Sequence, residues 1–287
     1  MNNNTNFIQF KKRRELGEIL TDTFAFIRNN GKPLLTLLLK TSAIPFILLL
    51  IAAGYYTYLS GDILNLEALQ HGNLIDTGSL FVSAAFLFIT LSVFYSCLFG
   101  SIMFFIKEYI KNKGTVDIDN TTIQIKDALP KLIGVGLISM LIISVGFFMC
   151  ILPGIYFYVP LNLVFSIMVF EEKGSSESIS DSFSLIKGEW WMSFATLFIV
   201  SIIISFIGFI FSLPGVIYTL MQTFTASEQG SIADFSVNQD WVFIALNTLS
   251  SLQYVLYGIM AISVAFIYYN IKEKKFSTGA FEEIDSL

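Results

Sequence analysis

The chain has 287 residues, of which 54% are hydrophobic and only 14% are charged, and its mean hydropathy is +0.70. Soluble domains carry roughly 25% charged residues. The composition therefore excludes an ordinary soluble domain and indicates an integral membrane protein, for which no nucleic-acid partner is expected. The net charge of −5 carries little information, because the distribution of cations orients a membrane protein and their sum does not.

The cations are distributed on one side of a predicted bilayer. All seventeen Lys and Arg residues lie in four segments, which are 1–40, 107–131, 171–189 and 272–287. The two remaining connections, 62–76 and 228–240, contain acidic residues and no cation. Basic loops stay on the cytoplasmic side. We therefore expect a multi-pass protein of the bacterial cytoplasmic (inner) membrane with both termini in the cytoplasm.

The uncharged stretches predict an all-α, polytopic fold, because about 20 residues of helix cross the hydrocarbon core. Six transmembrane helices fit best, at 34–59, 80–106, 132–151, 155–170, 190–212 and 241–271. An even number keeps the basic C-terminus on the side of the N-terminus. In the stretch 132–170 the turn is expected at Leu152-Pro153-Gly154, since Pro153 and Gly154 together interrupt a helix.

A second Leu-Pro-Gly, at 213–215, leaves the stretch 190–227 open to two interpretations. Pro214 and Gly215 could turn a second hairpin. However, the residues after them are few and polar, and another crossing would place the C-terminus outside. We therefore predict that 216–227 is a short helix in the outer interface or tucked between other helices.

Two pairs of segments indicate an internal repeat. Residues 18–28 (EILTDTFAFIR) match 177–187 (ESISDSFSLIK), so that Asp22 aligns with Asp181. Residues 142–154 also resemble 203–215, which aligns the two Leu-Pro-Gly breaks. We predict that Asp22 and Asp181 occupy equivalent places and cap a helix or pair with cations near the next span.

The first repeat pair has apolar residues at helical spacing, namely Leu16, Ile19, Leu20, Phe24 and Ile27, and in the copy Ile179, Phe183 and Ile186. These helices are expected to be amphipathic and to lie in the cytoplasmic interface. The loop 116–130 has room for a third. The single membrane domain 1–287 is thus predicted to contain three tandem modules of helix plus hairpin, at about 14–106, 116–170 and 176–271, with a tail at 272–287.

Several of these segments resemble a known family. They are the opening 14–20 (RELGEIL), the hairpin 152–156 (LPGIY), Glu171, the stretch 181–191 (DSFSLIKGEWW) and the end 266–274 (FIYYNIKEK). They are similar to the membrane domain of glycerophosphodiester phosphodiesterases and its stand-alone relatives. That family carries its catalysis in a separate soluble barrel, for which this chain has no residues, so the resemblance implies a membrane domain without that activity.

Candidate chemistry in the chain is sparse, so no enzyme activity, cofactor or metal site is expected. His71 is the only histidine and cannot build a multi-histidine metal site. The polar residues within the spans are neutral. Asn162, Asn247 and Gln253 either hydrogen-bond between helices or line a polar path for a substrate.

The leading hypothesis is a non-enzymatic scaffold or subunit of a membrane assembly, with membrane lipids and membrane proteins as partners. The alternative is a transporter or flippase-like accessory that moves a lipid or an uncharged solute. A third hypothesis, a membrane hydrolase using His71, has the least support in the sequence.

Overall fold

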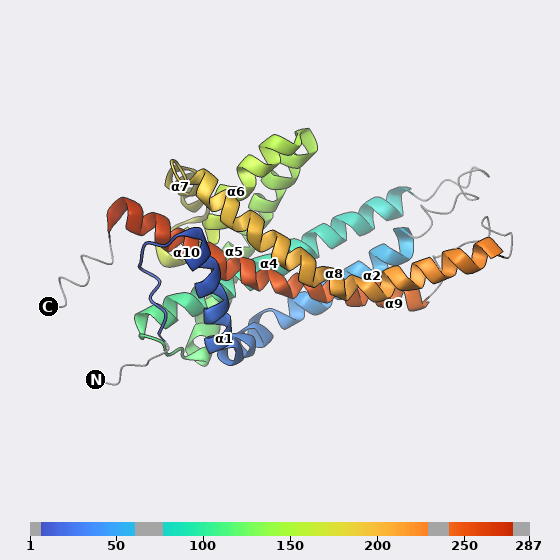
Figure 1. The fold of residues 1–287 in the computed structure, drawn as a ribbon, viewed down its shortest axis with the longest axis horizontal. Helices are drawn as coiled ribbons and strands as arrows, with labels where there is room; N and C mark the ends of the chain where they lie inside the picture. Colours follow the sequence, from blue (N-terminus) through green and yellow to red (C-terminus); the bar gives the residue numbers. More distant parts are fainter. Residues whose placement is uncertain (1–6, 61–76, 229–240, 278–287) are drawn as a thin grey trace. The chain divides into compact units, whose positions relative to one another are not determined.

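The computed structural model describes residues 7–60, 77–228 and 241–277, and every regular element in these residues is helical (Figure 1). The elements in chain order are α1 (Leu16–Thr41), α2 (Ala43–Ser60), α4 (Thr77–Lys111), α5 (Ile118–Met149), α6 (Ile151–Phe170), α7 (Ser175–Leu185), α8 (Trp190–Glu228), α9 (Trp241–Ser250), the 3₁₀ helix η4 (Ser251–Leu256) and α10 (Tyr257–Phe276).

Within the described residues, six helical segments are long and apolar enough to cross a membrane. They are Ala43–Ser60, Gly78–Lys111, Ile118–Met149, Ile151–Phe170, Trp190–Phe224 and Trp241–Phe276. The predicted all-α, polytopic class with six candidate spans is thereby confirmed. The chain divides into two compact units, which are described separately. The first comprises Met1–Ala43, Tyr95–Ile203 and Tyr257–Leu287, and the second comprises Ile44–Phe94 and Ile204–Leu256.

The core of the first unit surrounds α10, which packs against α1 and α6. Nearly every side chain from Gly258 to Ile271 is buried, so α10 has no exposed stripe of the kind that a peripheral helix keeps. Phe266 stacks on Phe10 of the N-terminal segment with ring centroids 4.2 Å apart. The helix most central to this unit is therefore the last one in the chain.

Two helix ends follow from proline chemistry. Pro153 has no N–H with which to bond the carbonyl of residue 149, and α5 ends at Met149. Pro45 stands in the same relation to Thr41, the last residue of α1. The predicted break at Leu152-Pro153-Gly154 is therefore wrong. The break is at Cys150, which is extended (φ −171°, ψ 152°), and Pro153 and Gly154 lie in the first turn of α6.

Gly154 has a packing role in this hairpin. A Cβ at this position would lie 2.5 Å from the ring of Phe147, so only glycine lets the start of α6 lie so close to α5.

The predicted interruption at Pro214 and Gly215 is also wrong. Helix α8 runs without a break for 39 residues, so 216–227 is not a separate helix. A proline in a helix interior removes one backbone hydrogen bond, and the helix continues where surrounding groups compensate for that loss. Hydroxyl groups on either side bond to other carbonyls of the helix, Ser212 to Phe209 and Thr219 to Gly215, whereas the carbonyl that Pro214 leaves without its helical donor is that of Ile210.

Three other predicted boundaries need correction. The expected first span 34–59 begins only at Ala43, because residues 16–41 form one helix. The segment 116–130 holds no separate interfacial helix, since most of it is the beginning of α5. The last span, expected as one helix over 241–271, is interrupted by the 3₁₀ segment η4.

The buried faces of α1 and α7 coincide only in part with the predicted apolar faces, and Ile19 and Ile186 belong to both. In α1 the buried residues include Ile19, Thr23 and Phe26, whereas Phe24 is 40% exposed. The corresponding residues of α7, displaced by the same interval as the sequence match, are Ser178, Ser182 and Leu185, and all three are buried. The two helices thus turn equivalent faces into the first unit.

In the second unit, small residues allow α9 and η4 to approach their neighbours. A Cβ at Gly54 of α2 would lie 3.0 Å from the Thr248 hydroxyl, and a Cβ at Gly208 of α8 would lie 2.6 Å from Gln253 Oε1. Polar side chains therefore fit against glycine, as is typical of packing between membrane helices.

We expect Gly136→Ala to destabilise the protein by roughly 1–3 kcal/mol, because an added methyl group overpacks a close helix contact. A Cβ at Gly136 would lie 1.9 Å from Ser96 Oγ and 3.3 Å from the Phe165 ring. Thermal unfolding in mild detergent, followed by tryptophan fluorescence, measures the effect. Gly134→Ala is the matched control, since a Cβ there meets nothing within 4 Å. Equal stability of the two variants would contradict the close contact.

Candidate functional site: a polar layer around the end of α10

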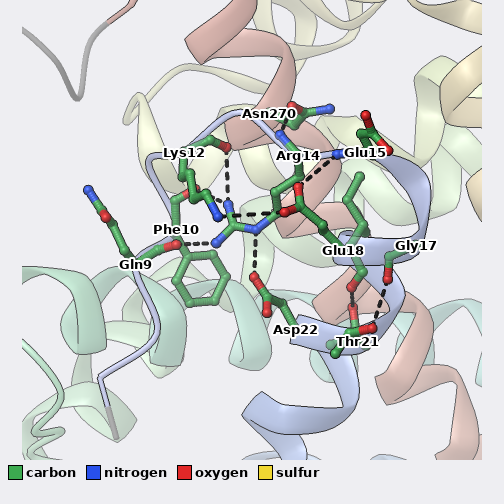
Figure 2. A network of polar contacts seen from close by, with 12 residues as sticks. Gln9, Phe10, Lys12, Arg14, Glu15, Gly17, Glu18, Thr21, Asp22 and Asn270 are labelled. Atoms are coloured by element: carbon green, nitrogen blue, oxygen red, sulfur yellow. Dashed lines mark hydrogen bonds and ion pairs between the residues drawn. The ribbon is translucent and has the colours of Figure 1, made fainter. Parts of the chain in front are cut away.

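Arg14 is the most buried cation of a polar cluster next to the N-terminal segment (Figure 2). Its side chain is 1% exposed, and its Nε donates to Asp22 Oδ2 at 2.8 Å. Nη1 donates to the carbonyls of Phe10 (2.7 Å) and Lys12 (3.1 Å), and Nη2 donates to the carbonyl of Gln9. A guanidinium has five N–H donors, so this geometry satisfies most of a group that is costly to bury unpaired.

The N-terminal segment and α10 hold this cluster in place. Asn270 of α10 is fully buried, and its Oδ1 accepts the backbone N–H of Arg14 at 2.8 Å. The guanidinium carbon lies 4.8 Å from the centroid of the Phe266 ring, which is within the range of a cation–π contact. The first residues of the described chain are thereby fixed to the last helix.

Asp181, which aligns with Asp22 in the predicted repeat, makes a corresponding pair. Its Oδ2 accepts a hydrogen bond from Lys173 Nζ at 2.6 Å, and Lys173 precedes it by eight residues, just as Arg14 precedes Asp22. The helices α1 and α7 begin after Glu15 and Gly174, which are also equivalent positions in the alignment. Both aspartates therefore pair with a cation that stands just before their helix.

Glu171, directly after α6, is the centre of a second cluster. Lys173 Nζ lies 2.8 Å from its Oε2, Lys272 Nζ lies 2.8 Å from its Oε1, and the Tyr268 hydroxyl donates to Oε1 at 2.7 Å. Partial burial by itself raises the pKa of Glu171. The hydrogen bonds from Lys173, Lys272 and Tyr268 outweigh burial and lower the pKa to about 2. The carboxylate is therefore charged at neutral pH.

Two more lysines of α10 extend the cluster to α7 and α8. Lys274 Nζ lies 2.8 Å from Glu189 Oε2, immediately before α8. Lys275 Nζ donates to the carbonyls of Leu185 and Lys187, at 2.8 and 2.9 Å. A cation at a helix C-terminus satisfies free carbonyls and opposes the negative end of the helix dipole.

We call this set the polar layer. Its members are Arg14, Asp22, Glu171, Lys173, Asp181, Glu189, Asn270, Lys272, Lys274 and Lys275. The layer joins the ends of α1, α6, α7 and α8 to the end of α10. Its charges are directed at one another, an arrangement suited to fixing helices in position.

The three neutral amides predicted to line a polar path belong to different units. Asn162 is buried in the first unit, where its Nδ2 donates to the Tyr158 carbonyl of its own helix at 2.7 Å. Asn247, in the second unit, likewise donates to the Phe243 carbonyl at 3.1 Å. Gln253 lies in η4 against Gly208.

The remaining candidates are placed as follows. Pro153, Gly154, Pro214 and Gly215 are helical residues, as described above, and His71 lies outside the described residues. Cys97 is buried, whereas Cys150 is exposed at the break between α5 and α6. Within the described ranges, no three His, Cys, Asp or Glu side chains are arranged to hold a metal ion.

Sequence reasoning did not identify Arg14, Glu171 or the lysines of α10 as members of one cluster. A signal for part of it was present. If the alignment of 18–28 with 177–187 is extended four residues towards the N-terminus, Arg14 aligns with Lys173. The contacts of α10 had no such signal, because its cations are far from their partners in the chain.

Comparison of the chain with models of protein families, with curated proteins and with solved structures finds no match. The resemblance to the phosphodiesterase membrane domain therefore stays a prediction from the residues quoted above.

We expect Asp22→Ala to lower the free energy of unfolding by about 3 kcal/mol, the low end of the range for a buried ion pair that loses one partner. Asp181→Ala is the matched variant, and it should cost less than about 1 kcal/mol because Lys173 is 30% exposed and keeps Glu171. Thermal or denaturant unfolding in the same detergent compares them. A larger loss for Asp181→Ala would contradict the description of the two pairs.

Proposed function

We propose that this protein is a non-enzymatic scaffold or subunit of a membrane assembly. The observation that carries the proposal is the polar layer, in which one helix, α10, ties together four others. Ion pairs reach the end of α6 and the start of α8, and hydrogen bonds reach α1 and α7. Paired charges in a partly buried layer hold helix ends in one arrangement. A rigid layer of this kind suits a protein whose task is to present surfaces to other membrane components.

The surface available for presentation is apolar. At the turn between α5 and α6, Phe148 is 94% exposed, Met149 77% and Leu152 75%. Lipid and the transmembrane helices of other proteins are the natural partners of such side chains. The one-sided cations of the sequence support a bacterial inner-membrane location with cytoplasmic termini. The phosphodiesterase activity of the family that the chain resembles is not part of the proposal.

The scaffold proposal predicts a reproducible protein partner. A photo-crosslinking amino acid at Phe148, introduced in living cells, should give one discrete crosslinked product, which mass spectrometry then identifies. Tagging that partner should recover this chain in return. The same amino acid at buried Phe105 is the control and should give no product. A protein that purifies alone and forms no crosslink from any exposed apolar position would contradict a scaffold.

A second function is supported by the second unit. The last span is interrupted by η4, and a 3₁₀ stretch within a helix often marks a functional hinge. Gln253 lies in this interruption, and Asn247 lies one turn before its start. Discontinuous spans with polar groups form substrate sites in many transporters. We therefore keep transport of a lipid or an uncharged solute as the alternative.

The transport alternative predicts that Asn247→Leu and Gln253→Leu abolish flux of lipid or solute in reconstituted liposomes while thermal stability changes little. Asn162→Leu, in the first unit, is the control and should leave flux unchanged. The absence of flux in the parent protein, or undiminished flux in the two variants, would exclude this alternative.

A further inference from the structure

The placement of α6 within the first unit bears on how the α5–α6 hairpin meets the membrane. Both helices are long and apolar enough to cross. A crossing hairpin would place the two ends of α6 on opposite faces of the bilayer, whose hydrocarbon core is about 30 Å thick. The contacts at the two ends of α6 decide between a crossing and a non-crossing arrangement.

The C-terminal end of α6 lies at the polar layer, where Glu171 binds Lys272. The start of α8 lies at the same level, because Glu189 binds Lys274, only two residues further along α10. Two residues of helix correspond to about 3 Å of rise. Trp190 directly follows Glu189, so its backbone lies at the edge of the polar layer.

The N-terminal part of α6 returns to this level. Trp190 Nε1 lies 3.5 Å from the Tyr156 carbonyl oxygen, and the two rings are stacked with centroids 6.2 Å apart. An α-helix rises about 22 Å between residues 156 and 171, so an upright α6 would hold Tyr156 far from the layer. Contact with Trp190 requires α6 to be strongly inclined.

Helix α7 supports this orientation. It packs against α6 (Figure 1). The Phe183 ring lies 6.1 Å from the ring of Phe157. Near the start of α7, Glu177 Oε1 lies 3.8 Å from Lys173 Nζ, which also binds Glu171 at the end of α6. An 11-residue helix with charged side chains is too short to cross a membrane. Helix α6 is therefore bound to α7, an element that stays at the membrane surface.

The turn between α5 and α6 has the chemistry of a segment within lipid. All side chains from Phe147 to Leu152 are exposed, and none is charged. The backbone groups of the turn residue are satisfied locally, because Cys150 N–H donates to the Gly146 carbonyl and the Cys150 carbonyl accepts from Gly154 N–H. A turn without water requires such internal pairing.

A groove of about 550 Å³ lies between the hairpin and α8. It is lined by Leu152, Ile155, Tyr156, Trp190, Trp191 and Phe194. Tryptophan and tyrosine favour the boundary between headgroups and acyl chains. The groove therefore has the side chains expected of a surface that contacts lipid at the level of the polar layer.

We propose that the α5–α6 hairpin is re-entrant, so that it enters and leaves the bilayer at the face that carries the polar layer, and that acyl chains of that leaflet occupy the groove beside Trp190 and Trp191. A re-entrant hairpin returns the chain to the same face as a crossing one, so the positions of the termini and of the basic segments are unchanged. The proposal adds a lipid-binding surface to either function discussed above.

The native Cys150 provides the first test, since the chain has only two cysteines. In Cys97→Ala protein, a membrane-impermeant maleimide added outside intact spheroplasts should not label Cys150. Lys111→Cys serves as the inner control and Asn73→Cys, in the predicted outer connection 62–76, as the outer one, each without the native cysteines. Labelling of Cys150 at the level of Asn73→Cys would overturn the proposal.

The second test is a crosslink. The pair Tyr156→Cys and Trp190→Cys, in protein lacking both native cysteines, should be joined by a short homobifunctional thiol crosslinker, which spans the space that the two aromatic side chains occupy. The pair Thr41→Cys and Ser101→Cys, whose hydroxyl groups lie 2.8 Å apart, is the positive control and checks that such variants fold. A crosslink in the control and none between positions 156 and 190 would also overturn the proposal.

The lipid contact is tested with bromine quenchers. A variant that keeps only Trp191, made by Trp190→Phe and Trp241→Phe, is reconstituted in phospholipids brominated on their acyl chains. Trp191 fluorescence should fall several-fold relative to vesicles of unbrominated lipid. Unchanged fluorescence would exclude acyl chains from the groove, and that part of the proposal would fail independently of the topology.

Discussion

The arrangement of the first unit depends on the ion pairs between the end of α10 and the acidic residues that end α6 and precede α8. Lys272 and Lys274 hold Glu171 and Glu189, and each pair joins residues that are far apart in the sequence. These charges lie next to an apolar core, where an unpaired ion is costly and a paired one fixes geometry. The helices therefore have little freedom to exchange partners, and the last helix that the structure describes holds the end of α6 and the start of α8 in place.

The two segments of the predicted repeat form equivalent pairs with different cations. Arg14 is enclosed by carbonyl groups of the N-terminal segment, and the planar fork of a guanidinium can serve Asp22 and several carbonyls at once. Lys173 stands among Glu171, Glu177 and Asp181, and a compact ammonium suits several carboxylates around one point. The equivalent pairs support the predicted repeat of a helix that precedes a span. The division of the whole chain into three modules stays a prediction.

Composition and cation distribution were sufficient to predict the helical membrane class and the number of candidate spans, because both depend on sums over many residues. The helix breaks were harder. Pro45 and Pro153 each follow a helix end by four residues, whereas Pro214 lies inside a continuous helix. The lost hydrogen bond is the same in all three cases, so whether the helix breaks depends on its surroundings. That information is tertiary, as are the contacts of Asn270 and the lysines of α10, so local patterns could not supply it.

Neither the distribution of cations nor the hydropathy of the spans can distinguish a crossing hairpin from a re-entrant one. Both arrangements return the chain to the same face, and both bury apolar helices in lipid. The connections differ, however. The chain passes between α2 and α4 through residues 61–76, and between α8 and α9 through residues 229–240, and both connections contain acidic residues. The connection between α5 and α6 is the single residue Cys150, flanked by exposed apolar side chains. A turn at an aqueous face would expose these side chains to water, whereas a turn that ends within the bilayer places them in lipid. The length and polarity of the connection therefore carry information that the helices themselves lack.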